Sequence, residues 1–272
     1  MSLADRDVAI AAAEAGAAVV RSRYGASLPR LDKAQGDFAT VADIEAETAI
    51  LDVLRSARPG DAVLAEESGQ SGPAAANRTW LVDPLCGTVN YAAQTALVAV
   101  NVALRAGPAV TVAASADPFA REVFWAAGNR AYVRRHGLDE PLAPSPDSRL
   151  VEANLDPPFP NGPAFRAVEL LADPEFGDRF RPRVVSSTLA VAWVAAGRRA
   201  AYVTDGNLAD SVHFASGIAL CRAAGCVVTG LQGQPLHTGV RGLIAAADQE
   251  THTTLLAVIG RRFPQWAPRT RA

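Results

Sequence analysis

The residues of this sequence that could do chemistry gather in three short stretches, each where an expected strand ends or an expected helix begins. They are Asp43 with the later pair Glu66-Glu67, the run Asp83-Pro84-Leu85-Cys86-Gly87-Thr88, and His213 with Asp210-Ser211 before it. Carboxylate, thiol and imidazole groups are the side chains that bind metals, transfer protons and attack as nucleophiles. These three stretches are therefore the candidate functional site.

The run from Asp83 to Thr88 is the most informative of the three. Asp83 and Cys86 are three residues apart across a proline turn, and Thr88 stands at an expected helix start. Free backbone N–H groups at a helix start favour an anion, and the same environment lowers the pKa of a thiol. A reactive cysteine is therefore one interpretation of the run. On spacing alone we favour the other, in which Cys86 is a small buried apolar residue and Asp83 a turn former.

His213 falls in the first turn of the helix expected over residues 210–224. A positive charge is disfavoured at a helix N-terminus, so we predict a neutral imidazole. A neutral imidazole suits a metal ligand and a general base equally. His136, His237 and His252 are expected on the exposed surface, and Cys221 and Cys226 in packing positions.

The elements that must position these residues follow from hydrophobic spacing and turn signals. In the first half we predict helices over 5–24 and 40–58, a loop or hairpin over 25–38, strands over 61–65 and 79–85, and an antiparallel meander over 97–104, 109–116, 122–127 and 130–134. In the second half we predict strands over 150–154, 183–186, 200–204, 227–229 and 242–246, and helices over 163–171, 188–196, 210–224 and 249–262. This order predicts an α/β (α+β) protein of sheets covered by helices.

We expect an N-terminal α+β half over residues 1–140 and a C-terminal α/β half over 141–272. The two halves would form one compact structural unit with the site at their junction. The polar, proline-containing stretch 141–147 would link them.

The bulk composition excludes several classes of protein. Apolar residues make up 49% and charged residues 20%, which is an ordinary globular balance, and the net charge is −2. No basic excess indicates nucleic acid or an anionic membrane as a partner, and no apolar run is long enough to span a membrane. Three cysteines argue against a disulfide framework and for a cytoplasmic location.

Three motifs of this chain resemble those of the inositol monophosphatase family. The family pattern is T-x-x-D, then G-E-E-S, then W-x-x-D-P-I/L-D-G-T-x-N-F, and the matching residues are Thr40–Asp43, Ala65–Ser68 and Trp80–Tyr91. The similarity continues in order through Asp117-Pro118, Val194–Arg198, Ala224-Gly225 and Leu243–Ala247. It therefore covers nearly the whole chain.

The resemblance implies a five-layer αβαβα sandwich and a Mg²⁺-dependent phosphomonoesterase that is usually dimeric. In such an enzyme Glu66, Asp83 and the Leu85 carbonyl would hold the first metal ion. Thr88 would help to orient the attacking water, and Asp43 would act from behind the metal ligands. We also expect Gly87, Thr88, Ser187, Thr188 and Asp205 to contact the substrate, a small phosphorylated or polar metabolite.

The chain departs from the family pattern at the positions of the second metal ion. The family has an aspartate where this chain has Cys86, and its W-D-x-A-A-G motif is here Val212–Gly217, with His213 in place of aspartate. Hard dications prefer oxygen ligands, so Mg²⁺ at the full family stoichiometry is not expected. If the backbone is retained, the Cys86 sulfur and a His213 ring nitrogen should lie within about 3–5 Å of each other.

Three explanations of this departure remain open. Cys86 could be a nucleophile with His213 as its base and Asp83 or Asp43 as the orienting carboxylate. Asp83, Cys86 and His213 could instead form a zinc site with an open fourth position, which would keep phosphomonoester hydrolysis. The site could also have decayed to a scaffold or binding function. We prefer the first, in an enzyme of a specialised biosynthetic pathway.

Overall fold

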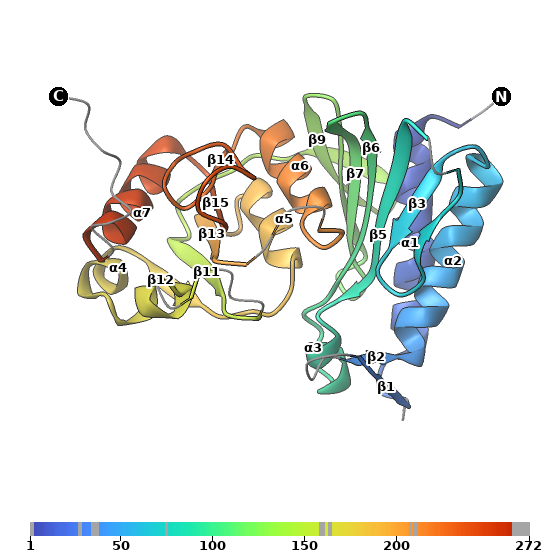
Figure 1. Cartoon of the computed structure of the whole chain (residues 1–272), viewed down its shortest axis with the longest axis horizontal. Helices are drawn as coiled ribbons and strands as arrows, with labels where there is room; N and C mark the ends of the chain where they lie inside the picture. Colours follow the sequence, from blue (N-terminus) through green and yellow to red (C-terminus); the bar gives the residue numbers. More distant parts are fainter. Residues whose placement is uncertain are drawn as a thin grey trace. The chain divides into compact units, whose positions relative to one another are not determined.

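The computed structural model describes residues 3–26, 29–33, 38–73, 76–157, 161–162, 165–206, 208 and 211–262, with only the backbone for residue 262. The chain divides into two compact units (Figure 1). The first contains Met1–Pro141, Ser187–Leu189 and Val212–Ala223, and the second contains Leu142–Ser186, Ala190–Ser211 and Ala224–Ala272. The sequence had indicated a division near residue 140, but not the return of two later segments to the first unit.

The first unit is built on an eight-stranded sheet with the order β10-β9-β8-β7-β6-β5-β3-β4. Its strands are β3 (Ala62–Ala65), β4 (Gly69–Ser71), β5 (Arg78–Cys86), β6 (Ala99–Ala106), β7 (Ala109–Asp117), β8 (Glu122–Ala127), β9 (Arg130–Arg135) and β10 (Leu138–Pro141). The antiparallel pairing of β6 to β9 confirms the predicted meander. The short edge strands β4 and β10 were not predicted.

Helices cover both faces of this sheet. On one face α1 (Asp5–Arg23) and α2 (Val41–Ala57) pack side by side (Figure 1), and Trp80 and Val82 of β5 belong to the same hydrophobic core. Leu81 points to the other face, as strand alternation requires, and packs with Val212 and with Ala215 of α6 (Ala215–Ala224). Cys86 ends β5, and Val212, the neighbour of His213, packs against the other face of the same sheet. Both stretches therefore belong to the first unit.

A close approach of α1 to α2 depends on Gly16. A Cβ at this position would lie 2.7 Å from the Ile50 Cδ1 atom of α2, closer than non-bonded carbons come.

The hairpin of β1 (Arg30–Asp32) and β2 (Phe38–Thr40) precedes α2 directly. Thr40 caps α2, because its hydroxyl accepts a hydrogen bond from the Ala42 N–H.

The second unit is a five-stranded sheet with the order β12-β11-β13-β15-β14. Its elements are β11 (Leu150–Asn154), η2 (Ala167–Ala172), α4 (Pro174–Arg179), β12 (Arg181–Arg183), α5 (Leu189–Ala195), β13 (Ala201–Thr204), β14 (Val227–Thr229), β15 (Leu243–Ala246) and α7 (Gln249–Arg262). Phe165, Phe176 and Ile259 pack with the strands in one hydrophobic core. The five-layer order predicted for the whole chain stays a prediction.

Several sequence predictions are corrected by the structure. The helix expected over 163–171 is a short 3₁₀ helix over Ala167–Ala172, and the strand expected over 183–186 lies at Arg181–Arg183. The helix expected from residue 210 begins at Ala215, so His213 precedes it; Asp210 lies outside the described residues. His252 is buried rather than exposed, because it packs inward from α7 and contacts Thr229. No helix in the described part of the chain is long and apolar enough to cross a membrane.

Candidate active site

A break in the ladder between β5 and β6 places the central residues of the site. Asp83 pairs with Asn101 and Cys86 with Ala99, and the register shifts between these two pairs. Pro84 lies in the shift and has no N–H to donate to a ladder. Gly87 follows with φ of 106°, a conformation that favours glycine, and α3 (Thr88–Ala92) begins directly after it. The bulge and the sharp turn therefore fix where Asp83, Cys86 and Thr88 lie.

Asp83, Cys86 and His213 come together at this point. The His213 Nδ1 atom lies 2.9 Å from the Asp83 Oδ2 atom and 3.9 Å from the Glu66 Oε2 atom. One ligand atom from each of Asp83, Cys86 and His213 lies within 4.8 Å of the other two. The expected approach of the Cys86 sulfur to a His213 ring nitrogen is therefore present. Asp83 is buried, whereas the His213 side chain is 42% exposed.

Backbone and side-chain groups around residue 187 hold Cys86 in place. The Thr188 N–H donates to the Cys86 Sγ atom at 3.3 Å, and the Ser187 hydroxyl donates to the Cys86 carbonyl at 3.2 Å. Both residues lie directly before α5 and are buried. Ser187 and Thr188, predicted as substrate contacts, thus position the thiol in this structure, and substrate contact stays a prediction.

A buried polar network behind Asp83 escaped the sequence analysis. The Asn101 amide donates to the Thr188 hydroxyl at 2.8 Å and to the Asp83 Oδ2 atom at 3.4 Å, and its oxygen accepts from the Ser115 hydroxyl at 2.8 Å. The asparagine in the otherwise apolar stretch Ala96–Leu104 was the available signal, because a polar side chain inside a buried strand needs partners. Asn101 therefore links Asp83 to the segment that holds Cys86.

Thr88 and Asp43 form the second part of the site. The Thr88 hydroxyl donates to the Asp43 Oδ1 atom at 3.0 Å and to the Leu85 carbonyl at 3.2 Å. The other Asp43 oxygen, Oδ2, accepts from the Thr40 N–H and from the Thr40 hydroxyl, each at 2.7 Å. Asp43 is thus a capping residue of α2 that also orients Thr88, from a buried position.

Glu66 and Glu67 bring a cation into the site. The Lys33 ammonium lies 3.1 Å from the Glu66 Oε1 atom and 2.6 Å from the Glu67 Oε1 atom. Glu47 fixes the same turn, because its carboxylate accepts from the Glu67 N–H at 2.8 Å and from the Ser68 N–H at 2.9 Å. Lys33 and Glu47 were not predicted, since one lies in a loop and the other on a helix face of ordinary amphipathic pattern.

The protonation of His213 differs from the sequence prediction. Burial alone would lower the pKa of His213, but the charge and hydrogen bond of Asp83 raise this pKa well above its ordinary value. The prediction of a neutral imidazole is therefore wrong, because the partner carboxylate comes from a distant strand. Burial opposes the charged form of Asp83 as well, yet His213 lowers the pKa of Asp83. The two side chains form an ion pair.

The thiol of Cys86 also differs from its prediction. Burial, and after it the negative charge of Asp83, raise the pKa of Cys86 to about 11. A lowered pKa was expected from the helix start, but the buried strand end outweighs it. Burial and Asp83 likewise raise the pKa of Glu66 to about 8. At neutral pH the Asp83–Cys86–His213 cluster therefore holds a carboxylate, a protonated thiol and an imidazolium, while the neighbouring His213 and Lys33 charges oppose the rise in the pKa of Glu66.

The remaining predicted residue, Asp205, lies in the second unit. It is buried, its Oδ1 atom accepts from the Ala167 N–H at 3.2 Å, and its Oδ2 atom lies 3.6 Å from the Arg166 Nε atom. Burial raises the pKa of Asp205. Its described partners thus belong to the second unit, and a role in substrate binding stays a prediction.

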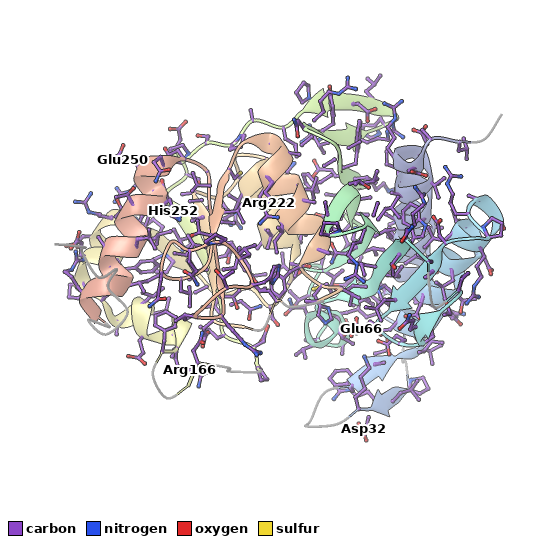
Figure 2. All side chains as sticks on the ribbon, turned by 45° about the horizontal axis from the view of Figure 1, so that its top comes forward. Asp32, Glu66, Arg166, Arg222, Glu250 and His252 are labelled. Carbon is purple, nitrogen blue, oxygen red and sulfur yellow. The ribbon has the colours of Figure 1, made fainter. Side chains whose placement is uncertain are left out.

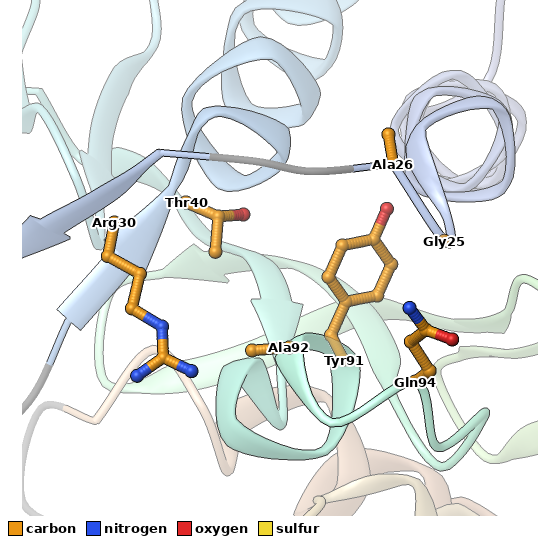
Figure 3. A pocket seen from close by; sticks show the side chains of 7 residues that line it. All are labelled: Gly25, Ala26, Arg30, Thr40, Tyr91, Ala92 and Gln94. Atoms are coloured by element: carbon orange, nitrogen blue, oxygen red, sulfur yellow. The ribbon is translucent and has the colours of Figure 1, made fainter.

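A cavity of about 340 Å³ lies beside α3 in the first unit (Figure 3). Its lining residues are Gly25, Ala26, Arg30, Thr40, Tyr91, Ala92 and Gln94. Thr40, the hydrogen-bond partner of Asp43, belongs to this lining, whereas Cys86 and His213 do not. The cavity therefore adjoins the Asp43 side of the site and is separate from the reactive cluster.

Comparisons with known proteins agree with this arrangement. A family model described as "Inositol monophosphatase family" matches residues 4–262. An inositol-1-monophosphatase of Caulobacter vibrioides is 32% identical over 82% of this chain and 88% of its own, and one of Synechocystis is 30% identical over 96% and 90%. The crystal structure of the extragenic suppressor protein suhB from Bartonella henselae has a TM-score of 0.82 at 25% identity, covering 93% of this chain and 97% of its own.

These matches confirm the α+β fold and the resemblance on which the site was predicted. They extend over both units and over every motif that carries a candidate residue. The chain belongs to the inositol monophosphatase family.

Proposed function

We propose that this chain is an enzyme that hydrolyses a small phosphorylated metabolite, with Asp83, Cys86 and His213 as the reactive cluster. The observation that carries the proposal is the convergence of these three side chains, with one ligand atom of each within 4.8 Å of the others. They come from a strand end and from a segment about 130 residues later, so packing alone does not require their approach. Family membership supports the phosphorylated substrate.

His213 supplies positive charge and a proton in this proposal. Asp83 holds the ring at Nδ1 and keeps it protonated, so the imidazolium attracts the phosphate and can protonate a leaving oxygen. Thr88, oriented by Asp43, offers a hydroxyl to the same region. The Thr188 N–H and Asn101 fix Cys86 and Asp83 and keep the cluster rigid.

The covalent route uses the sulfur of Cys86. The Sγ atom attacks phosphorus, the P–O bond to the leaving group breaks, and His213 gives its proton to the leaving oxygen. The thiol proton passes to an oxygen of the dianionic phosphate. Water then cleaves the S–P bond, releasing hydrogen phosphate and returning one proton each to Cys86 and His213. This route needs no free thiolate, which the raised pKa of Cys86 disfavours.

A second candidate is a zinc-dependent phosphomonoesterase, which the donor set itself favours. A thiol, an imidazole and a carboxylate are ligands that zinc accepts and that Mg²⁺ does not prefer. The buried Asp83 Oδ1 atom has no hydrogen-bond partner among the described residues, so it is open to a cation. The cluster thus does not fit the family's Mg²⁺ pair, but it does fit zinc. Bound zinc would supply Lewis acidity and lower the pKa of a water molecule.

Chelation and alkylation distinguish the two candidates. The purified protein would be assayed with inositol monophosphates, sugar phosphates and phosphoadenosine compounds, before and after chelator treatment. The thiol route predicts activity that resists chelation and is lost when iodoacetamide modifies Cys86. Cys221 and Cys226, both buried, serve as internal controls in peptide mapping. The zinc route predicts loss with chelator and recovery with Zn²⁺.

The Cys86→Ala variant tests the proposal as a whole. Full activity and full ligand binding in this variant would contradict both routes and leave a scaffold function. Turnover of inositol monophosphate at about 1 per second or faster in millimolar Mg²⁺ would also contradict the proposal, because it would show the ordinary family reaction. We further propose a cytoplasmic homodimer in a specialised biosynthetic pathway. Family resemblance supports the dimer, and the small, odd number of cysteines supports the compartment.

A further inference from the structure

Lys33 is the only lysine in the chain, although Lys and Arg together number 26. The other residues in that count are arginines, yet this one, directly after β1, is a lysine. Arginine offers a planar, fixed fork, whereas lysine offers a compact point charge on a flexible stem. At residue 33 the chain therefore offers a compact charge where an arginine would offer a fork.

The ammonium of Lys33 lies between two carboxylates of the candidate site. It is 3.1 Å from the Glu66 Oε1 atom and 2.6 Å from the Glu67 Oε1 atom, and its side chain is 28% exposed. Glu66 is also the residue that lies 3.9 Å from His213. Lys33 therefore brings its charge directly beside the reactive cluster.

The turn that carries the two carboxylates is anchored to α2. Glu47 of this helix binds the backbone N–H groups of Glu67 and Ser68. Figure 2 labels Glu66, in the turn between β3 and β4, and Asp32, the neighbour of Lys33, at the end of β1. Because lysine carries its ammonium on a flexible four-carbon stem, a competing cation would displace Lys33 and not the anchored turn.

We propose that Lys33 is a tethered cation that competes with divalent metal ions for the Glu66–Glu67 pair. A dication that binds Glu66 must displace the ammonium or lie beside it, and like charges a few ångströms apart repel strongly in a partly buried site. Lys33 thereby lowers the affinity for hard dications on the side of the site where oxygen ligands remain. This inference does not depend on the chemistry proposed for Cys86, since it concerns metal affinity alone.

Calorimetric titration with Mg²⁺ alone tests the competition. The Lys33→Met variant keeps the length of the stem and removes the charge, so it should bind Mg²⁺ about tenfold more tightly than the wild type, or more. The Lys33→Arg variant keeps the charge and can pair bidentately with a carboxylate. It should bind no more tightly than the wild type. The proposal is overturned if Lys33→Met gains no affinity, or if Lys33→Arg gains as much as Lys33→Met.

A second measurement needs no substitution, because the lysine is unique. Reductive ¹³C-methylation labels Lys33 and the N-terminal amine, keeps the positive charge, and gives one lysine resonance that is missing from the Lys33→Arg variant. Displacement from Glu66 predicts that this resonance shifts as Mg²⁺ binds, with the same midpoint as the calorimetric titration. Sodium chloride at matched ionic strength should leave it in place. Mg²⁺ binding with an unmoved resonance would overturn the proposal.

Discussion

The two units each contain a histidine in a different environment, His213 in the first and His252 in the second. The His213 side chain is 42% exposed, lies 2.9 Å from the Asp83 carboxylate, and has a pKa well above the ordinary value. His252 on α7 (Figure 2) is 4% exposed, contacts the Thr229 hydroxyl at 2.7 Å, and has a pKa lowered by burial. A buried carboxylate at hydrogen-bond distance thus raises the pKa of the partly exposed imidazole, whereas burial beside a hydroxyl lowers the pKa of the other.

This difference separates a reactive histidine from a structural one. The charged His213 faces Cys86 and Glu66 in a group of titratable side chains, whereas the neutral His252 joins α7 to β14 through one hydroxyl. Perturbed pairs of titratable groups are typical of functional sites. The substitutions below either remove the difference between the two histidines or measure its size.

The largest effect is expected from Asp83→Asn, which should leave His213 uncharged at neutral pH, as His252 is. Without the carboxylate the pKa of His213 should fall, because Asp83 is what raises it. The pKa of Cys86 should fall as well, because the same charge raises that pKa above its ordinary value. Loss of the oriented imidazolium should lower kcat/KM about a hundredfold or more. The pKa of His213 is measured by NMR titration, and that of Cys86 by the pH dependence of alkylation.

Asn101→Leu is the control for this prediction. It removes the amide that donates to the Asp83 Oδ2 atom at 3.4 Å but keeps the Asp83 carboxylate, so the pKa of His213 should stay raised. An unchanged pKa of His213 in the Asp83→Asn variant would show that burial, and not the ion pair, sets its protonation.

The second effect is a gain of metal affinity in the double variant Cys86→Asp with His213→Asp. It replaces a thiol and an imidazole by carboxylates at positions whose side chains already converge, and oxygen ligands suit Mg²⁺. We expect measurable Mg²⁺ binding by calorimetry and Mg²⁺-dependent phosphatase activity. A folded double variant that binds no Mg²⁺ would show that the rest of the metal site has also been lost.

A smaller effect is expected on the Asp43 side of the site. Thr88→Val removes the hydroxyl that donates to Asp43 and to the Leu85 carbonyl, leaving a buried carboxylate with fewer donors. The free energy of unfolding should fall by about 1–3 kcal/mol, and the pKa of Asp43, already raised by burial, should rise further. Chemical denaturation of the variant measures the loss. Thr88→Ser keeps the hydroxyl and should stay close to the wild type.

The elements predicted from sequence were those whose signals are local. The first helix, the capped helix α2 and the strand that ends at Cys86 follow from spacing, Thr40 and the proline turn, and the structure confirms them. The motifs also identified the residues that converge. The protonation of His213 and Cys86 was predicted wrongly, because it depends on Asp83, which His213 meets across 130 positions of the chain.

The residues that the sequence did not reveal act through long-range pairing. Asn101 lies on a different strand from Asp83, and its other partners are Ser115 and Thr188, 14 and 87 positions away. Lys33 meets Glu66 across a hairpin, a helix and a strand. Periodicity cannot show such pairs, because it reports which face of an element is buried and not which groups face it.

The smallest effect concerns His252 and the dependence of stability on pH. Burial lowers the folded-state pKa of His252 below the ordinary value of about 6.5, so the unfolded chain binds this proton more readily than the folded one. As far as it depends on His252, the free energy of unfolding is therefore highest above about pH 6.5 and falls as the pH falls toward the folded-state pKa of His252. This single group changes it by at most about 1.4 kcal/mol per pH unit. His213, whose pKa is raised, acts in the opposite direction: its contribution is full below about pH 6.5 and is lost as the pH rises through its folded-state pKa.

His252→Gln keeps an N–H donor for Thr229 and cannot take up a proton. Its free energy of unfolding should match the wild type at pH 8 and depend less on pH between 6.5 and 5, as measured by urea denaturation at each pH. Equal slopes for the two proteins would show that His252 does not resist protonation in the fold.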